Sequence, residues 1–132
     1  MSFLIDTNII IYKFKNNTAV IENFRRHKNS LKYLSSITLG EMVYGAYKSQ
    51  RVIENSEKVN QLKSLFHIIP VTDPVFETFG KLKAAHGKQG ITIEDFDLLL
   101  AATALTYRLV LVTHNLKHFQ KIKGLSVEDW TR

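Results

Sequence analysis

The sequence predicts an α/β fold of three layers, in which a central parallel sheet is covered by helices on both faces. Short β-type runs alternate with segments of helical periodicity along the 132 residues. Parallel strands need helical crossovers of this kind to connect them. No linker, repeat or low-complexity tract interrupts the alternation. We therefore expect one domain spanning residues 1–132 with a single core.

The N-terminal part of the chain predicts two strands and two helices. Phe3–Ile5 is a short β-type run, and Asn8 suits the N-cap of a helix that begins at Ile9. Thr18–Lys28 has apolar residues on one side and basic residues off it, which indicates an amphipathic helix. Leu31–Ser35 is the second expected strand.

The middle of the chain predicts a third strand between helices. One helix begins at about Thr38, where apolar residues recur at helical spacing, and another fits Ile53–Phe66. The strand is His67–Val71. Asp73 suits the N-cap of the next helix and Pro74 its first position.

The last third predicts a loop, a buried helix and two strands. The preceding helix is expected to end at about His86, and Gly87–Gly90 to form the loop. Leu98–Leu105 is continuously apolar or small, which indicates a buried helix. The remaining strands are Leu109–Thr113 and Leu125–Val127.

Composition limits the class of protein. Lys and Arg total 18 against 12 acidic residues, and the net charge of +6 favours a polyanionic partner such as nucleic acid. A solvated basic surface is an equally good interpretation of that charge. The absence of Cys excludes disulfides and thiolate metal sites. No apolar run approaches the roughly 20 residues of a membrane-spanning helix and no export signal is visible, so we expect a soluble, cytoplasmic protein.

Polar residues follow two of the expected strands, which is where ligands bind in open parallel sheets. Asp6 and Asn8 follow the first strand, and Thr113, His114 and Asn115 follow the fourth. If these strands are adjacent in the sheet, the two groups meet. The structural alternative is that Asp6 and Asn8 only cap a helix and Asn115 only makes a turn.

Glu41 and Asp97 also have both a structural and a functional interpretation. Thr38–Glu41 fits a capping box, and so does Thr92–Asp95. A carboxylate in the first turn of a helix, such as Asp97, gains about 0.3–1 kcal/mol from the helix dipole. Asp97 nevertheless shares a face with small apolar residues such as Ala101, so we expect its side chain to point inward.

Carboxylates that converge inside a fold need a cation. Two of them about 5 Å apart repel by about 3 kcal/mol at an effective dielectric constant near 20. A cluster therefore protonates or recruits a metal ion. Oxygen ligands without Cys favour Mg²⁺ or Mn²⁺ over zinc.

Four segments that together span most of the chain carry a family resemblance. They are Leu4–Asn8, Ser36–Gly45, Asp97–Ala102 and Val112–Asn115. In this order and spacing they resemble the PIN-domain ribonucleases, particularly the VapC-type toxins. The resemblance implies a metal-dependent endoribonuclease whose catalytic metal ligands are Asp6, Glu41 and Asp97. It also implies that Thr113 and Asn115 line the same cleft.

The chain departs from the family pattern at His118, just before Phe119. Many relatives have a fourth carboxylate there, so a second metal ion is expected to bind weakly or only with substrate present. We interpret His118 as a surface or phosphate-contacting residue, with direct ligation less favoured because Mg²⁺ prefers oxygen. The implied reaction is hydrolysis of an RNA phosphodiester by metal-activated water.

The resemblance also implies partners: a cognate antitoxin that blocks the cleft, a second copy of the chain in a homodimer, and a toxin–antitoxin hetero-oligomer. The substrates it suggests are structured RNAs such as tRNA or ribosomal RNA. Apolar helical residues that suit either a partner surface or the core are Tyr44, Tyr47, Ile53 and Leu62. Basic residues for holding the RNA backbone, which the sequence does not rank, are Lys48, Arg51 and Lys88.

Three other interpretations stay open. A PIN-like module could hold RNA or protein without cutting, although the acidic residues are intact. A metal-independent ribonuclease could use histidines as acid and base, but none of the five sits in a recognisable pair. A DNA-directed nuclease would use the same metal chemistry. Binding of Mn²⁺ distinguishes the silent module from the metal-dependent enzyme. Activity in the presence of a chelator distinguishes the histidine-based ribonuclease from it.

Overall fold

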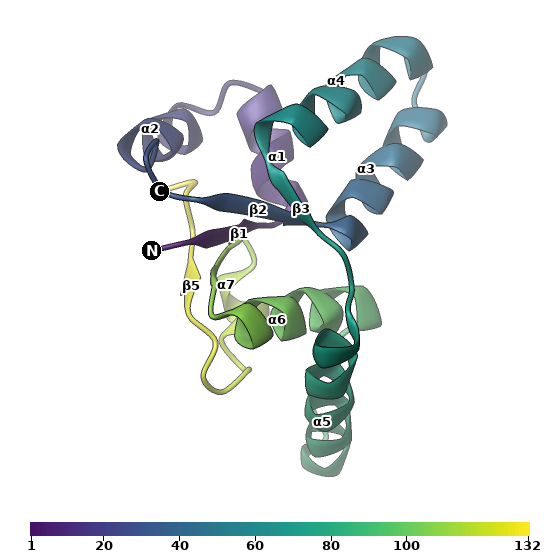
Figure 1. Ribbon diagram of the computed structural model, residues 1–132, viewed down its shortest axis with the longest axis vertical. Helices are drawn as coiled ribbons and strands as arrows, with labels where there is room; N and C mark the ends of the chain where they lie inside the picture. The colour runs from purple at the N-terminus through teal and green to yellow at the C-terminus, as the bar shows by residue number, and fades with distance from the viewer.

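The computed structural model describes residues 1–132 and contains one sheet of five parallel strands (Figure 1). The strands are β1 (Phe3–Ile5), β2 (Lys32–Ser35), β3 (His67–Ile69), β4 (Val110–Val112) and β5 (Val127–Glu128). The helices are α1 (Thr7–Phe14), α2 (Thr18–Arg26), α3 (Ser36–Lys48), α4 (Val52–Leu65), α5 (Asp73–Gln89), α6 (Asp95–Tyr107) and α7 (Leu116–Phe119). None of the helices combines the length and the apolar character that crossing a lipid bilayer requires.

The strand order is β3-β2-β1-β4-β5, which makes the first strand the central one. The chain builds outward from β1 on one side through β2 and β3, and then on the other side through β4 and β5. The order therefore reverses between β1 and β4. In doubly wound sheets, the crevice outside the carboxyl ends of the strands at such a reversal is the usual ligand site.

Helices cover both faces of the sheet, as the sequence predicts. Figure 1 shows α1 to α4 on one face and α5 and α6 on the other. Alternate residues of β1 face the two layers. Phe3 and Ile5 pack with buried residues of α1, α2 and α4, whereas Leu4 packs with those of α6. Burial on both faces explains why the strands read as continuous apolar runs.

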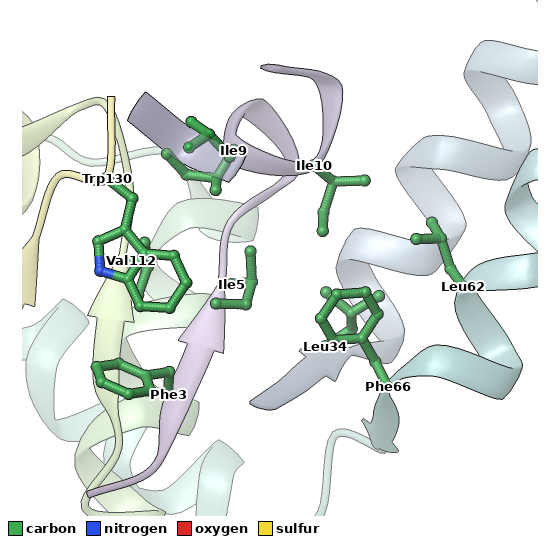
Figure 2. Packing of buried hydrophobic residues seen from close by; sticks show 10 residues of the cluster. Phe3, Ile5, Ile9, Ile10, Leu34, Leu62, Phe66, Val112 and Trp130 are labelled. Carbon is green, nitrogen blue, oxygen red and sulfur yellow. The ribbon is translucent and has the colours of Figure 1, made fainter. Parts of the chain in front are cut away.

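Trp130 fills the core on the side of α1 and α2. Its side chain is 2% exposed, its ring meets Phe3 edge-on and stacks on His27, and its Nε1 donates a hydrogen bond to Glu128. Figure 2 shows it beside Phe3 and Val112. The last residues of the chain are thereby packed against the first strand.

Two predicted helix starts are wrong, although the preceding strands end at Ile5 and Ser35 as predicted, because each helix follows its strand more directly than expected. Asp6, not Asn8, is the N-cap of α1 and accepts a hydrogen bond from the first helical N–H. Ser35, not Thr38, is the N-cap of α3. Thr38 is instead buried inside the helix, so the capping box predicted for Glu41 does not form.

Other boundaries also differ from the prediction. Thr72, rather than Asp73, precedes α5. The predicted loop Gly87–Gly90 is mostly helical, because α5 continues to Gln89. Gly90 is the C-cap of this helix, and its φ of 71° suits glycine. The capping box predicted for Thr92–Asp95, before α6, is absent. β5 begins at Val127, later than expected, and the short helix α7 was not predicted.

Candidate active site

Asp6 stands at the carboxyl end of the central strand. It directly follows β1, caps α1, and is 6% exposed. The N–H of Thr7 donates to Asp6 Oδ1 at 2.7 Å, and Thr113 Oγ1 donates to Asp6 Oδ2 at 2.8 Å. A third donor, Asn8 Nδ2, lies 3.4 Å from Oδ2. Both carboxylate oxygens therefore have fixed orientations.

The neighbouring strand brings Thr113 and Asn115 to the same place. β1 and β4 pair with Ile5 opposite Val112, so Asp6 and Thr113 are the next residues of the two strands. Thr113 is fully buried, and its Oγ1 accepts a hydrogen bond from the backbone N–H of Asn115 at 3.0 Å. The side chain of Asn115 is exposed at the start of α7.

Glu41 reaches the same edge of the sheet from α3. Thr7 Oγ1 donates a hydrogen bond to Glu41 Oε1 at 2.9 Å. Thr7 therefore links two carboxylates, one through its backbone N–H and one through its hydroxyl. This contact replaces the local capping role that the sequence allowed for Glu41.

Asp97 lies in the first turn of α6 with about a third of its side chain exposed. Its Oδ2 is 3.2 Å from His118 Nε2, which reaches it from α7. The inward orientation expected from the sequence is thus only partial. His118, at the position where the family pattern has an acid, contacts a carboxylate directly.

The three carboxylates are electrostatically coupled. The pKa of Asp6 is raised from 3.8 to about 6, mainly by burial and to a smaller extent by the charges of Asp97 and Glu41, against the lowering effect of the hydrogen bonds from Thr113 and Thr7. No three acidic or histidine side chains lie close enough, as they stand, to hold one ion directly. Mg²⁺ usually takes only one or two carboxylates and completes its shell with water and substrate. Asp6, a buried carboxylate that resists ionisation and is coupled to two other carboxylates, suits the binding of such a cation.

Two concave surfaces adjoin Glu41. One, of about 620 Å³, is lined by Glu41, Thr7 and the aromatic rings of Tyr44 and Phe96, both largely exposed. The other, of about 330 Å³, runs between α1, α3 and α4, and Glu41 and Thr7 line it too. Its apolar and basic lining includes Ile11, Phe14, Met42, Val59, Lys15 and Lys58.

The residues proposed from the sequence for partner and RNA contacts lie in different environments in the structure. Tyr44, Tyr47 and Ile53 are 66%, 70% and 79% exposed, but Leu62 is 1% exposed and belongs to the core. Lys48 lies over the ring of Tyr44. Arg51 pairs with Glu54 on the surface, and Lys88 lies in the last turn of α5. Lys15 and Lys58, which line the groove, were missed.

Sequence reasoning also missed a histidine–carboxylate pair at this edge. His114 Nδ1 is 3.1 Å from Asp129 Oδ2. The two residues follow the adjacent strands β4 and β5. They are far apart in the chain, and only the strand order, which the sequence does not state, brings them together.

Asp6 makes the stability of the metal-free protein depend on pH. Its pKa is about 6 in the folded state against 3.8 for an unperturbed Asp, as in the unfolded chain. The folded state therefore binds the proton more tightly than the unfolded state. The resulting stability is complete below pH 4 and is lost as the pH rises through 6, by at most about 3 kcal/mol. Urea unfolding in EDTA between pH 4 and 7 measures it. The Asp6→Asn variant should lack this part of the pH dependence, and an identical profile in both proteins contradicts the assignment.

Comparison with known proteins agrees with this geometry. A model of the PIN domain matches residues 3–125. The chain is 32% identical over 132 residues to a tRNA(fMet)-specific endonuclease VapC of Shigella flexneri, covering 99% of each. Two solved structures also match closely.

The first is VapBC2 from Rickettsia felis bound to a DNA fragment from their promoter, with 32% identity, coverage of 98% and 99%, and a TM-score of 0.92. The second is VapBC-1 from nontypeable Haemophilus influenzae, with 34% identity, complete coverage and a TM-score of 0.90. Both the fold class and the family resemblance predicted from the sequence are confirmed. The chain belongs to the PIN-domain family, among its VapC-type members.

Proposed function

We propose that this protein is a metal-dependent endoribonuclease that hydrolyses RNA phosphodiesters. The observation that carries the proposal is the buried carboxylate of Asp6, whose pKa is raised to about 6, mainly by burial and to a smaller extent by the charges of Asp97 and Glu41. These residues lie at the carboxyl edge of the sheet, beside β4, where the strand order reverses. The VapC relatives are named as ribonucleases or endonucleases, which supports RNA as the substrate.

Asp6 and Asp97 are the proposed principal ligands of Mg²⁺ or Mn²⁺, directly or through water, and Glu41 completes the acidic set. When bound, the ion supplies an activated water and offsets charge on the phosphate. The protein's own part is orientation. Thr113 and the N–H of Thr7 fix the two oxygens of Asp6. The hydroxyl of Thr7 holds Glu41.

The cleft beside Glu41 is the proposed path of the RNA strand. Exposed aromatic rings such as those of Tyr44 and Phe96 can stack on unpaired bases. Lys48, above the ring of Tyr44, is placed to meet the phosphate backbone. The relative from Shigella flexneri is named as tRNA(fMet)-specific, which supports tRNA as the first substrate to test. Because the substrate is cellular RNA, we propose that the protein acts in the cytoplasm.

We further propose that the protein is the toxin of a toxin–antitoxin pair and that a cognate antitoxin holds it inactive. The apolar groove between α1, α3 and α4 opens beside Glu41, so a segment seated in it would reach the acidic residues. The two solved relatives are VapBC structures, which supports this assembly. Exposed Tyr47 and Ile53 provide further apolar surface for the hetero-oligomer or for a homodimer.

The proposal is tested by mapping new RNA ends after purified protein is incubated with total RNA. With Mg²⁺ or Mn²⁺ we expect cleavage at a small set of sites, and EDTA should abolish it because the proposed nucleophile is a water activated by the metal ion. Cleavage that persists in EDTA would indicate histidine acid–base chemistry instead. Binding of Mn²⁺ by calorimetry without any cleavage would indicate a silent module, and both outcomes contradict the proposal.

A further inference from the structure

His114 is attached to the acidic edge of the sheet by its backbone. It follows β4 and Thr113, and its N–H donates a hydrogen bond to Asn8 Oδ1 at 3.2 Å. Its ring meets the ring of Tyr12 edge-on, with 5.5 Å between centroids. Asn8 lies two residues after Asp6, so the imidazole is held close to the proposed metal ligand without contacting it.

Asp129 and Thr131 surround one nitrogen of this ring. His114 Nδ1 lies 3.1 Å from Asp129 Oδ2 and 3.1 Å from Thr131 Oγ1. The hydroxyl of Thr131 donates its single hydrogen to Asp129 Oδ1 at 2.6 Å, so toward His114 it can only accept. The side chain of Asp129 is 2% exposed, and hydrogen bonds from Thr131 and His114 lower its pKa despite its burial, so it too only accepts.

These contacts determine the tautomer of His114. Because both neighbours of Nδ1 are acceptors, Nδ1 carries a hydrogen and donates it. Nε2 is then the free nitrogen of the ring, and it has no hydrogen-bond partner within the protein. The imidazole is 44% exposed. The ring is therefore held by one nitrogen and presents the other to solvent at the edge of the cleft.

We propose that His114, held by Asp129, is an RNA-binding residue whose Nε2–H donates to a phosphate oxygen of the substrate next to the scissile bond. This inference rests on the proposed nuclease function. The ionised carboxylate of Asp129 offsets the positive charge that the ring carries when both nitrogens hold a hydrogen. Arg132 Nε, 3.5 Å from Asp129 Oδ2, adds positive charge at the same edge. Anchoring the chain does not require the outward nitrogen, since the backbone N–H already makes the link to α1.

The test compares three variants on a short RNA that contains a mapped cleavage site. In His114→Gln, the KM should rise about tenfold while kcat stays within about twofold, because one charged hydrogen bond to bound substrate is lost. His114→Lys should restore most of the affinity, since a second cation can meet the same phosphate. His67→Gln is the matched control, because His67 is an exposed histidine at the start of β3, away from the carboxyl edge.

Salt dependence gives a readout that a merely structural role would not change. Losing one phosphate contact should lower the slope of log affinity against log salt by about 0.7 for a single strand. This slope is measured by fluorescence anisotropy in an Asp6→Asn background, which should not cut the RNA. Asp129→Asn should give the same loss of affinity by releasing the ring, with a melting curve to confirm that it folds.

Three results would overturn the inference: an unchanged KM and salt slope in His114→Gln, a large fall in kcat that Lys does not restore, or equal effects in the His67 control. The second result would indicate proton transfer rather than phosphate binding. If the wild-type protein cuts no RNA, the proposed function fails. The anisotropy comparison still tests whether His114 contacts RNA.

Discussion

Asp6→Asn is expected to lower the rate of RNA cleavage by at least about a thousandfold. A metal ion contributes several kcal/mol to stabilising the transition state, and each 1.4 kcal/mol is tenfold in rate. Asparagine keeps the size of Asp6 and can still accept the hydrogen bond that caps α1, but it removes the negative charge on which the cation depends. Single-turnover cleavage of the mapped RNA at saturating Mn²⁺ measures the effect.

Asp97→Asn should show a loss of similar size, and the same helix offers a matched control. Asp95 lies in the same first turn of α6 but is exposed and pairs with Lys83 across the surface. Asp95→Asn should therefore leave cleavage within about twofold. Melting curves should show all three variants folded, and metal-free Asp6→Asn should be no less stable than wild type at pH 7, because it avoids ionising a buried carboxyl. Full cleavage by both Asp6→Asn and Asp97→Asn would exclude the proposed site.

Trp130→Ala is expected to destabilise the fold by about 3–5 kcal/mol, a large part of the stability of a domain of this size. The indole is buried, with Phe3, Phe24 and His27 packed around it, so truncation leaves a cavity between the sheet and α2. The truncation also removes the hydrogen bond from Nε1 to Glu128. Urea unfolding in EDTA, followed by circular dichroism, measures the change in the free energy of unfolding.

Ile53→Ala is the control for this prediction, because Ile53 is also apolar but 79% exposed. This substitution should change the free energy of unfolding by no more than about 0.5 kcal/mol. Trp130→Phe should fall between the two, since it keeps an aromatic ring in the core. A loss below about 1 kcal/mol in Trp130→Ala would mean that the C-terminal segment is not part of the cooperative core.

The parts of the site that follow buried strands were predictable from sequence. Asp6 and Thr113 each come directly after an apolar run, and the carboxyl ends of adjacent parallel strands share an edge. For Glu41 and Asp97 the local pattern left a capping and a functional role open, and the family resemblance assigned them to the site. Their local sequences fit helix capping equally well, and only tertiary contacts decide between the two.

The errors in the prediction have two physical causes. Several consecutive residues can serve as an N-cap, and the end of the preceding strand selects Asp6 and Ser35 over their neighbours. The second cause is sequence distance. The pairing of His114 with Asp129 depends on β4 and β5 lying side by side, and no local periodicity reports which strands are adjacent.

The packing of Trp130 against the first strand affects how the protein is made. Phe3 leaves the ribosome long before Trp130, yet both belong to one core cluster, and β1 is flanked by β4 on one side. A nascent polypeptide that still lacks residues 110–130 cannot hold Asp6 against Thr113. Contacts so distant in sequence also form slowly. The acidic edge is thus completed only after residues 110–130 have been synthesised, so a shorter nascent polypeptide lacks the assembled site.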